Sequence, residues 1–166
     1  ADAAPRAGAL GLGKINHLLE GRHQVFAVMA LVALLQGLDG TQGPDLGQRQ
    51  VKGKPVIGLD AIDLALWTYH EDSFLPHGQR KAGYTDKQPI YLTTGAETPN
   101  GAGVRFLVDG AKAETFTGFV RIVYLFDGAD GEAKAVAREQ WSAAKAAGCA
   151  VTYWQQTDDG RWERKG

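Results

Sequence analysis

The chain has 166 residues, of which 44% are hydrophobic and 22% charged, as is ordinary for a globular domain with its own core. The formal net charge of -1 predicts no general attraction to nucleic acid, so any basic surface has to be local. The single cysteine, Cys149, excludes an internal disulfide, fits a reducing compartment and lies in an apolar strand pattern, where we expect a buried residue.

The first third of the chain has weak patterns. Residues 1–14 are rich in Ala and Gly, and we expect their start to be disordered. Residues 17–36 predict a helix that ends at Gly37, and residues 37–54, rich in Gly, Gln, Asp and Lys, predict a loop or linker.

An apolar run at residues 25–35 lies within this predicted helix. It is too short for a transmembrane helix, which needs about 20 apolar residues. Its length and the preceding Lys14 and Arg22 suit a signal-peptide core, but no small-residue cleavage site follows. We interpret the run as a buried helix.

Residues 8–14 fit the phosphate-binding pattern G-x-x-x-x-G-K. Ile15 stands where Ser or Thr would hold magnesium, and no strand is predicted before Gly8. Such a match arises easily by chance in a Gly-rich stretch, and a nucleotide-binding enzyme is kept as an alternative function.

The middle of the chain predicts a short strand at residues 56–57 and then a helix from a capping Asp60 to about Tyr69. A long loop follows, up to Lys87. Three strands are predicted next, at residues 89–93, 104–108 and 119–126. The first starts with a proline and is therefore expected at an edge, whereas the last is nearly continuously apolar and expected to be covered on both faces.

Residues 130–147 predict the clearest helix, because they are rich in alanine, start at a capping Asp130 and stop before Gly148. A strand is predicted at residues 149–154, followed by a turn and a polar end anchored by Trp162. The order strand, helix, strand favours a right-handed crossover in an α/β fold with a mostly parallel sheet.

One side of this last helix combines three cations with an indole. At about 100° per residue, the four side chains fall within roughly one 60° sector. They are Lys134, Arg138, Trp141 and Lys145. The helix is expected to bury its opposite side, with Ala133, Val136, Ala143, Ala144 and Ala147. The stripe fits either a solvated charged face or a docking site for an acidic peptide that ends in an aromatic residue.

Residues 66–78 concentrate aromatic, histidine and acidic side chains. His70, Glu71, Asp72 and His77 are possible metal ligands, but their spacing matches no common zinc pattern, and we expect neither a metal nor a cofactor. Catalytic acid or base use of the two carboxylates is equally unsupported. The segment fits either a helix end held by Trp67 and Phe74 in the core or an aromatic patch that receives a partner.

Both segments resemble the chi subunit of bacterial DNA polymerase III. The matching motifs are Leu66-Trp67 with Ser73-Phe74-Leu75-Pro76-His77, and Ala137-Arg138-Glu139-Gln140-Trp141 with Lys134 ahead. Further agreement lies at residues 89–93, 105–108 and 123–127, so the resemblance covers roughly residues 59–165 in order.

The resemblance implies a three-layer, mononucleotide-binding-like (Rossmann-like) fold without a functional nucleotide site. It also implies a non-catalytic, cytoplasmic adaptor between the clamp loader and single-stranded DNA-binding protein. The acidic tail of that protein would meet Lys134, Arg138 and Trp141, and Lys145 belongs to the same stripe. A psi or helicase-like partner would meet Trp67, Phe74, Pro76 and His77.

The resemblance does not extend to residues 1–55, where the family's first strand, a helix and a second strand are expected. That segment could be a divergent start, an unrelated extension or the product of a disturbed reading frame, and residues 56–166 are expected to form the chi-like part of a single domain. A direct nucleic-acid binder that uses the stripe and Trp162, Arg164 and Lys165 is a further alternative, although the net charge argues against it.

Overall fold

The computed structural model describes residues 9–15, 49–52, 58–68, 75–157 and 161–166. Eight strands and two α-helices make up this part of the chain. The strands are β1 (Ala9–Ile15), β2 (Arg49–Lys52), β3 (His77–Gln79), β4 (Ile90–Thr93), β5 (Val104–Leu107), β6 (Arg121–Asp127), β7 (Val151–Gln156) and β8 (Trp162–Arg164). The helices are α2 (Gly58–Thr68) and α3 (Gly131–Ala146), and two short 3-10 turns, Arg80–Ala82 and Thr85–Lys87, follow β3.

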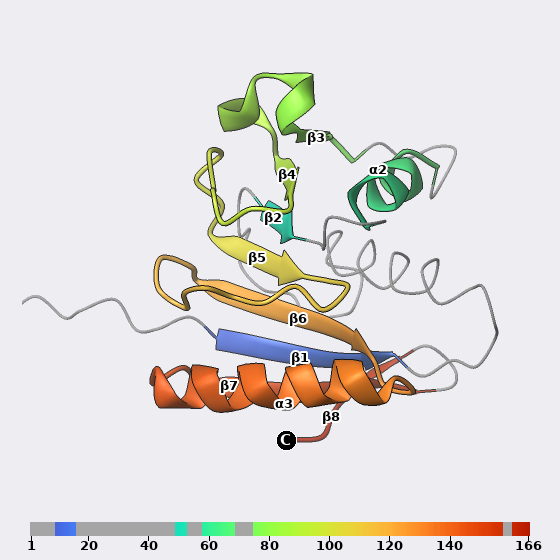
Figure 1. The fold of residues 1–166 in the computed structure, drawn as a ribbon, viewed down its shortest axis with the longest axis vertical. Helices are drawn as coiled ribbons and strands as arrows, with labels where there is room; N and C mark the ends of the chain where they lie inside the picture. Colours follow the sequence, from blue (N-terminus) through green and yellow to red (C-terminus); the bar gives the residue numbers. More distant parts are fainter. Residues whose placement is uncertain (1–8, 16–48, 53–57, 69–74, 158–160) are drawn as a thin grey trace, which may run out of the picture.

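All eight strands belong to one sheet in the order β3-β4-β2-β5-β6-β1-β7-β8 (Figure 1). Every neighbouring pair is parallel except β7 and β8. The outermost strands have only three residues each, which limits the exposed edge. The expectation of a mostly parallel α/β sheet is confirmed.

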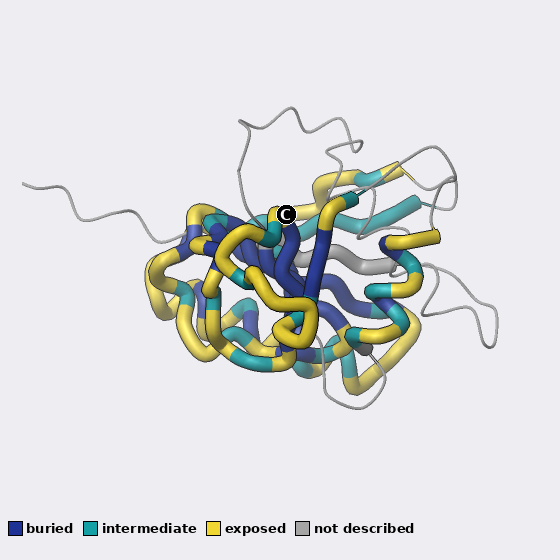
Figure 2. Tube along the Cα trace, turned by 90° about the horizontal axis from the view of Figure 1, so that it is seen from above, coloured by how far each residue is buried: buried dark blue, intermediate teal, exposed yellow. Residues whose placement is uncertain are grey.

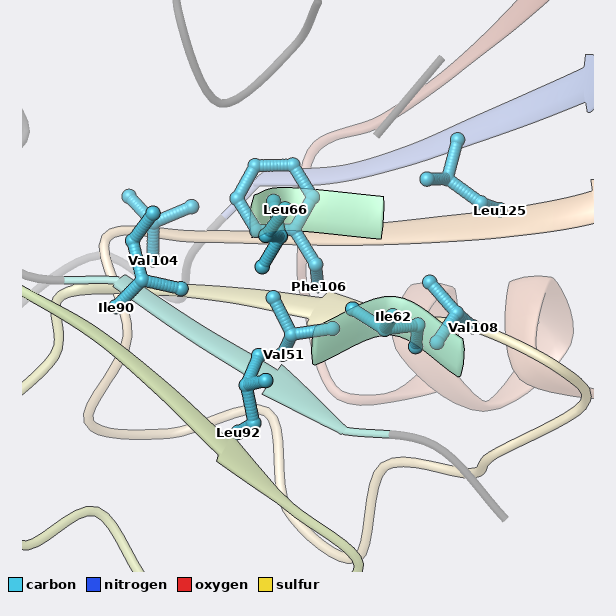
Figure 3. Packing of buried hydrophobic residues seen from close by; sticks show 9 residues of the cluster. All are labelled: Val51, Ile62, Leu66, Ile90, Leu92, Val104, Phe106, Val108 and Leu125. Atoms are coloured by element: carbon cyan, nitrogen blue, oxygen red, sulfur yellow. The ribbon is translucent and has the colours of Figure 1, made fainter. Parts of the chain in front are cut away.

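The two helices cover opposite faces of the sheet, which gives three layers. Ile62 and Leu66 of α2 pack into a cluster on one face (Figure 3). Ala137 and Ala144 of α3 pack into a second cluster on the other face. In the burial view the buried residues follow the strands between these layers (Figure 2).

Side-chain alternation along the strands explains the two clusters. Val104 and Phe106 of β5 join the α2 cluster, whereas Leu107 joins the α3 cluster. In β6, Leu125 faces α2 and Tyr124 and Phe126 face α3. The prediction of a strand covered on both faces is therefore confirmed for β6.

The last helix follows its sequence signals closely. The Asp130 carboxylate accepts hydrogen bonds from the backbone N–H groups of Glu132, at 2.8 Å, and Ala133, at 3.3 Å. Gly148 follows the helix with φ +79°, a left-handed conformation that favours glycine. Burial raises the pKa of the Cys149 thiol just before β7, as expected of a buried residue.

The N-terminal third contributes strands where none were predicted. β1 runs through residues expected to start disordered, and β2 lies within the expected loop at residues 37–54. Both lie inside the sheet and pair with a strand on each side. This pairing stabilises an extended conformation that their composition alone does not favour. The predicted helix at residues 17–36 and the strand at residues 56–57 lie outside the described residues.

The prediction of an edge strand at residues 89–93 is wrong. β4 begins after Pro89, and β3 pairs with its outer side while β2 pairs with its inner side. Pro89 thus precedes the hydrogen-bonded ladder, and its missing N–H leaves no gap within the strand. Neither α-helix in the described residues has the length and hydrophobicity of a membrane span.

Candidate functional site

The buried side of α3 differs in part from the prediction. Ala144 is fully buried and Ala133 and Val136 pack against the core, as expected, but Ala143 is exposed, as is Ala147 just after the helix. Ala137 and Gln140 take the buried positions instead. The buried side is therefore rotated toward the indole of Trp141.

Two polar side chains tie one flank of α3 to the loop after β5. The Gln140 side-chain oxygen accepts a hydrogen bond from the Ala113 backbone N–H at 3.0 Å. Lys112 Nζ donates to a Glu139 carboxylate oxygen at 2.7 Å, and both of these side chains are at least half exposed. These contacts explain why a polar residue such as Gln140 is buried in α3.

The opposite flank carries the four side chains of the predicted stripe. Arg138 and Lys145 are exposed, whereas Lys134 and Trp141 are half-buried. Trp141 packs against the α3 cluster, so the expected exposed indole is half-covered. Lys145 Nζ lies 5.0 Å from the centroid of the indole ring. The structure keeps the cations and the indole on one flank of the helix.

This flank suits an anionic chain end with an apolar tip. The Arg138 guanidinium can hold a carboxylate with two parallel hydrogen bonds, and the two lysines add charge without a fixed geometry. The indole offers an apolar edge beside them. Because the edge is already packed against the core, it needs little ordering when a ligand arrives.

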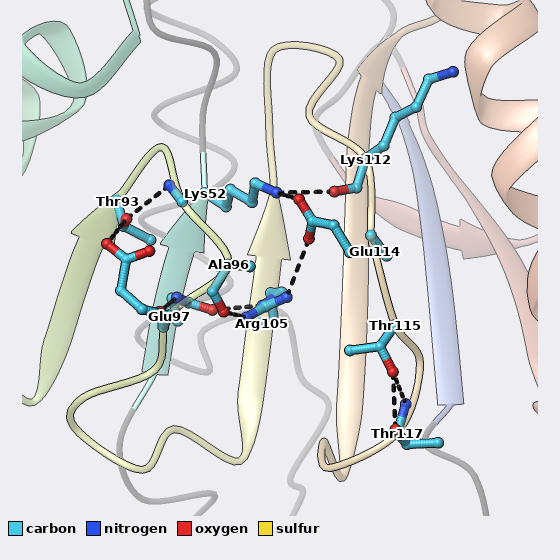
Figure 4. A network of polar contacts seen from close by, with 12 residues as sticks. Lys52, Thr93, Ala96, Glu97, Arg105, Lys112, Glu114, Thr115 and Thr117 are labelled. Carbon is cyan, nitrogen blue, oxygen red and sulfur yellow. Dashed lines mark hydrogen bonds and ion pairs between the residues drawn. The ribbon is translucent and has the colours of Figure 1, made fainter.

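A buried polar network under the loops around β2 and β5 escaped the sequence analysis (Figure 4). Lys52 and Arg105 are 6% and 1% exposed and face the same side of the sheet as α3. Lys52 Nζ donates to the Glu114 carboxylate and, at 3.2 Å, to the Lys112 carbonyl. Arg105 Nη2 donates to the Ala96 carbonyl at 2.7 Å.

The network combines two buried cations with the Glu114 carboxylate, and the charge of Glu97 also acts on Arg105. Burial lowers the pKa of Arg105, while Glu114 and Glu97 act to raise it. Burial acts to raise the pKa of Glu114, but the hydrogen bond from Lys52 and the nearby charges outweigh burial, so the pKa is lowered. A signal was available in the sequence for Arg105, which interrupts the apolar run at residues 104–108 and so points to a buried partner.

The second predicted site is only partly described. Trp67 is 54% exposed on α2, and its ring centroid lies 4.9 Å from that of His77. Pro76 is exposed, and Phe74 lies outside the described residues. Leu64, one turn before Trp67 and 63% exposed, belongs to the same surface and was missed because it lies outside the matching motif.

His77 is buried beneath Trp67 and is not available as a surface contact. Its Nδ1 lies 2.6 Å from the Leu75 carbonyl oxygen, and its Nε2 lies 3.7 Å from a carboxylate oxygen of Asp63. Its position supports the indole of Trp67 from below. His77 is therefore a buried contact of Trp67.

The alternative chemistries gain no support from the described residues. Within these ranges no three His, Cys, Asp or Glu side chains gather as a possible metal site, and residues 70–72 lie outside them. In the phosphate-binding pattern, Ala9 to Lys14 form most of β1 instead of a loop that leads into a helix.

Two comparisons with known proteins find the family that these motifs resemble. The family model described as "DNA polymerase III chi subunit, HolC" matches residues 51–152, well over half of the chain. The curated "Probable DNA polymerase III subunit chi" of Rickettsia prowazekii (strain Madrid E) is 38% identical over 49 residues. That alignment spans 30% of this chain and 30% of the relative. Because the family match runs from β2 into β7, the chain belongs to the DNA polymerase III chi subunit family.

Proposed function

We propose that the chain is a non-catalytic replication adaptor that works in the cytoplasm. It links the clamp loader and replicase to the acidic C-terminal tail of single-stranded DNA-binding protein. Membership of the chi family supports the replication role. The tail site is proposed at Lys134, Arg138, Trp141 and Lys145.

One observation carries the tail proposal: three cations and a half-buried indole share the flank of α3 opposite its loop contacts. The half-buried indole lies at the edge of the stripe nearest the core, so an apolar surface borders the three cations. The net charge of -1 also gives a DNA strand little general attraction, whereas a short acidic peptide needs only this local patch.

The test is fluorescence anisotropy with a labelled acidic peptide that ends in phenylalanine. Arg138→Ala and Trp141→Ala are each expected to weaken binding by about 1–3 kcal/mol, because one removes a carboxylate partner and the other an apolar contact. Arg121→Ala, which removes a cation from β6, is the matched control and is expected to bind normally. Unchanged affinity in both α3 variants would reject the site.

Labelled single-stranded DNA is the second probe in the same experiment. Tight DNA binding at moderate salt without peptide binding would favour a direct nucleic-acid binder instead. Weak, salt-dependent peptide binding with negligible DNA binding is the outcome that the adaptor proposal requires.

A second surface is proposed for a psi or helicase-like partner, around Trp67, Phe74, Pro76 and the supporting His77. The observation that favours it is the exposed apolar pair Leu64 and Trp67 on one side of α2. This surface lies on the α2 layer, so it is separate from the proposed tail site on α3.

Trp67→Ala is expected to reduce capture of a purified psi subunit at least tenfold and to leave tail-peptide affinity unchanged, because the two surfaces lie on different layers. Val120→Ala, which shortens an exposed apolar residue before β6, is the control. Full capture by the Trp67 variant would remove the assignment and leave the tail proposal intact.

A further inference from the structure

The flank of α3 that carries the cations faces the last two strands of the sheet. The helix packs over β6, β1 and β7, and its Glu139 and Gln140 side chains bind the loop after β5. The cationic flank lies roughly half a helical turn away from these two residues. Figure 1 shows β8 and the end of the chain on the side of α3 opposite β6.

Residues on β7 and β8 divide cleanly between the two faces of the sheet. Tyr153 packs against the α3 cluster, whereas Trp162 packs against the α2 cluster. Arg164 is paired with Trp154, one position away from Tyr153, and so shares the α2 face. Glu163 is paired with Gln155, which lies on the same face as Tyr153. Lys165 Nζ binds the Glu163 carboxylate, so the Lys165 side chain lies on the face that carries α3.

Backbone hydrogen bonds fix Lys165 beside Tyr153. The Lys165 N–H donates to the Tyr153 carbonyl and the Tyr153 N–H donates to the Gly166 carbonyl, both at 2.9 Å. Burial raises the pKa of the Tyr153 phenol, and the charge of Lys165 opposes that shift. The ammonium group of Lys165 thus lies on the same side of the sheet as the phenol ring of Tyr153.

The position along the helix also agrees. Tyr153 is in register with Leu12 of β1, and Leu12 is in register with Tyr124 of β6. The charge of Glu139 on α3 acts on the Tyr124 phenol, so this row of the sheet lies near the part of the helix around Glu139. That places Tyr153 level with Arg138 and Trp141, which lie beside Glu139 in the helix.

We infer that the anionic tail site continues from α3 onto the sheet, with Tyr153 as a second aromatic wall and Lys165 as a fourth cation. The inference deepens the proposed function and rests on it. The occupant is the same acidic peptide with an aromatic end, because the added residues extend the same combination of cations and rings.

The carboxylate of Glu163 affects how strongly Lys165 can bind the peptide. Lys165 Nζ donates to Glu163 at 2.7 Å, and these side chains are 46% and 53% exposed. Because the Glu163 carboxylate already pairs with Lys165, an incoming carboxylate competes with it for the ammonium group. An ion pair this exposed is weak, so the competition costs the ligand little.

The experiment compares charge changes on the two faces of one strand, with the acidic phenylalanine-ended peptide as the probe. Lys165→Gln is expected to weaken peptide binding about threefold at low salt. Arg164→Gln removes the same charge from the opposite face and is expected to leave the affinity unchanged. Glu163→Gln is expected to tighten binding about twofold, since it frees Lys165 and removes a like charge.

Equal effects of Lys165→Gln and Arg164→Gln would overturn the inference, as would weaker binding by Glu163→Gln. Arg138→Ala tests the proposed function separately. If the peptide binds on α3, this variant weakens binding whether or not the site extends to β8. Tyr153→Phe keeps the ring and is expected to bind normally. Tyr153→Ala, checked for folding by circular dichroism, is expected to weaken binding about tenfold.

Discussion

At the residue scale, the buried cations of the sheet depend on one carboxylate. Lys52 and Arg105 come from adjacent strands and are almost fully buried, yet Glu114, on a loop, is the acid that meets both. Arg105 also lies 4.1 Å from the centroid of the Phe119 ring. Removing one partner from such a group lowers the free energy of unfolding by more than the ion pair contributes to it, because a buried charge is left without a partner.

Glu114→Gln is therefore expected to lower the free energy of unfolding by about 1–3 kcal/mol, less than for a fully buried pair because the Glu114 side chain is 53% exposed. Urea denaturation measures this change. Glu139→Gln breaks the exposed ion pair with Lys112 and is expected to cost less than about 1 kcal/mol. Equal losses in the two variants would contradict the argument.

The Glu114→Gln variant is also expected to change how the stability of the fold depends on pH. The pKa of Glu114 lies below its ordinary value of 4.5, so its contribution is present above that pH and is lost as the solution is acidified through the lowered pKa. In Glu114→Gln, thermal melts between pH 3 and pH 6 are expected to depend less steeply on pH, since one such carboxylate is gone. An unchanged slope would show that the carboxylate is not held in its charged form.

At the element scale, α3 shows how much local sequence can determine. Its capping aspartate, alanine content and terminal glycine are signals within a few residues, and the structure matches all three. The stripe followed from helical geometry alone. The burial of Gln140 and the half-burial of Trp141 did not, because they depend on a loop and a sheet far away in the sequence.

Asp130→Ala is expected to lower the free energy of unfolding by about 1 kcal/mol, since two backbone N–H groups at the start of α3 lose their acceptor. Asp130→Asn keeps an acceptor oxygen and is expected to cost little. Chemical denaturation of both variants makes the comparison, and equal stability of the alanine variant and the unchanged chain would show that the cap contributes nothing.

At the scale of the whole molecule, the sheet shows where local signals fail. Ala9 to Ile15 include two glycines and a lysine, and no local pattern marks them as a strand. β1 nonetheless pairs with β6 on one side and β7 on the other. β3 was missed for a related reason, since three residues carry too little pattern to predict a strand.

Removal of residues 1–15 is expected to abolish cooperative folding, because it takes a strand from between two others and leaves both with unpaired backbone groups. Removal of residues 1–8 leaves β1 intact and serves as the control. Circular dichroism melts and size-exclusion chromatography compare the two truncations. A cooperative transition in the shorter chain would show that β1 is dispensable.

The placement of β1 also bears on how the chain reaches this fold during synthesis. Ala9 pairs with Arg121, and Leu10 pairs with Val151, so β1 must wait until residues 121–156 have left the ribosome. Until then its neighbours in the sheet do not exist. Closing contacts across so many residues is intrinsically slow, and we expect folding to be completed after translation rather than strand by strand.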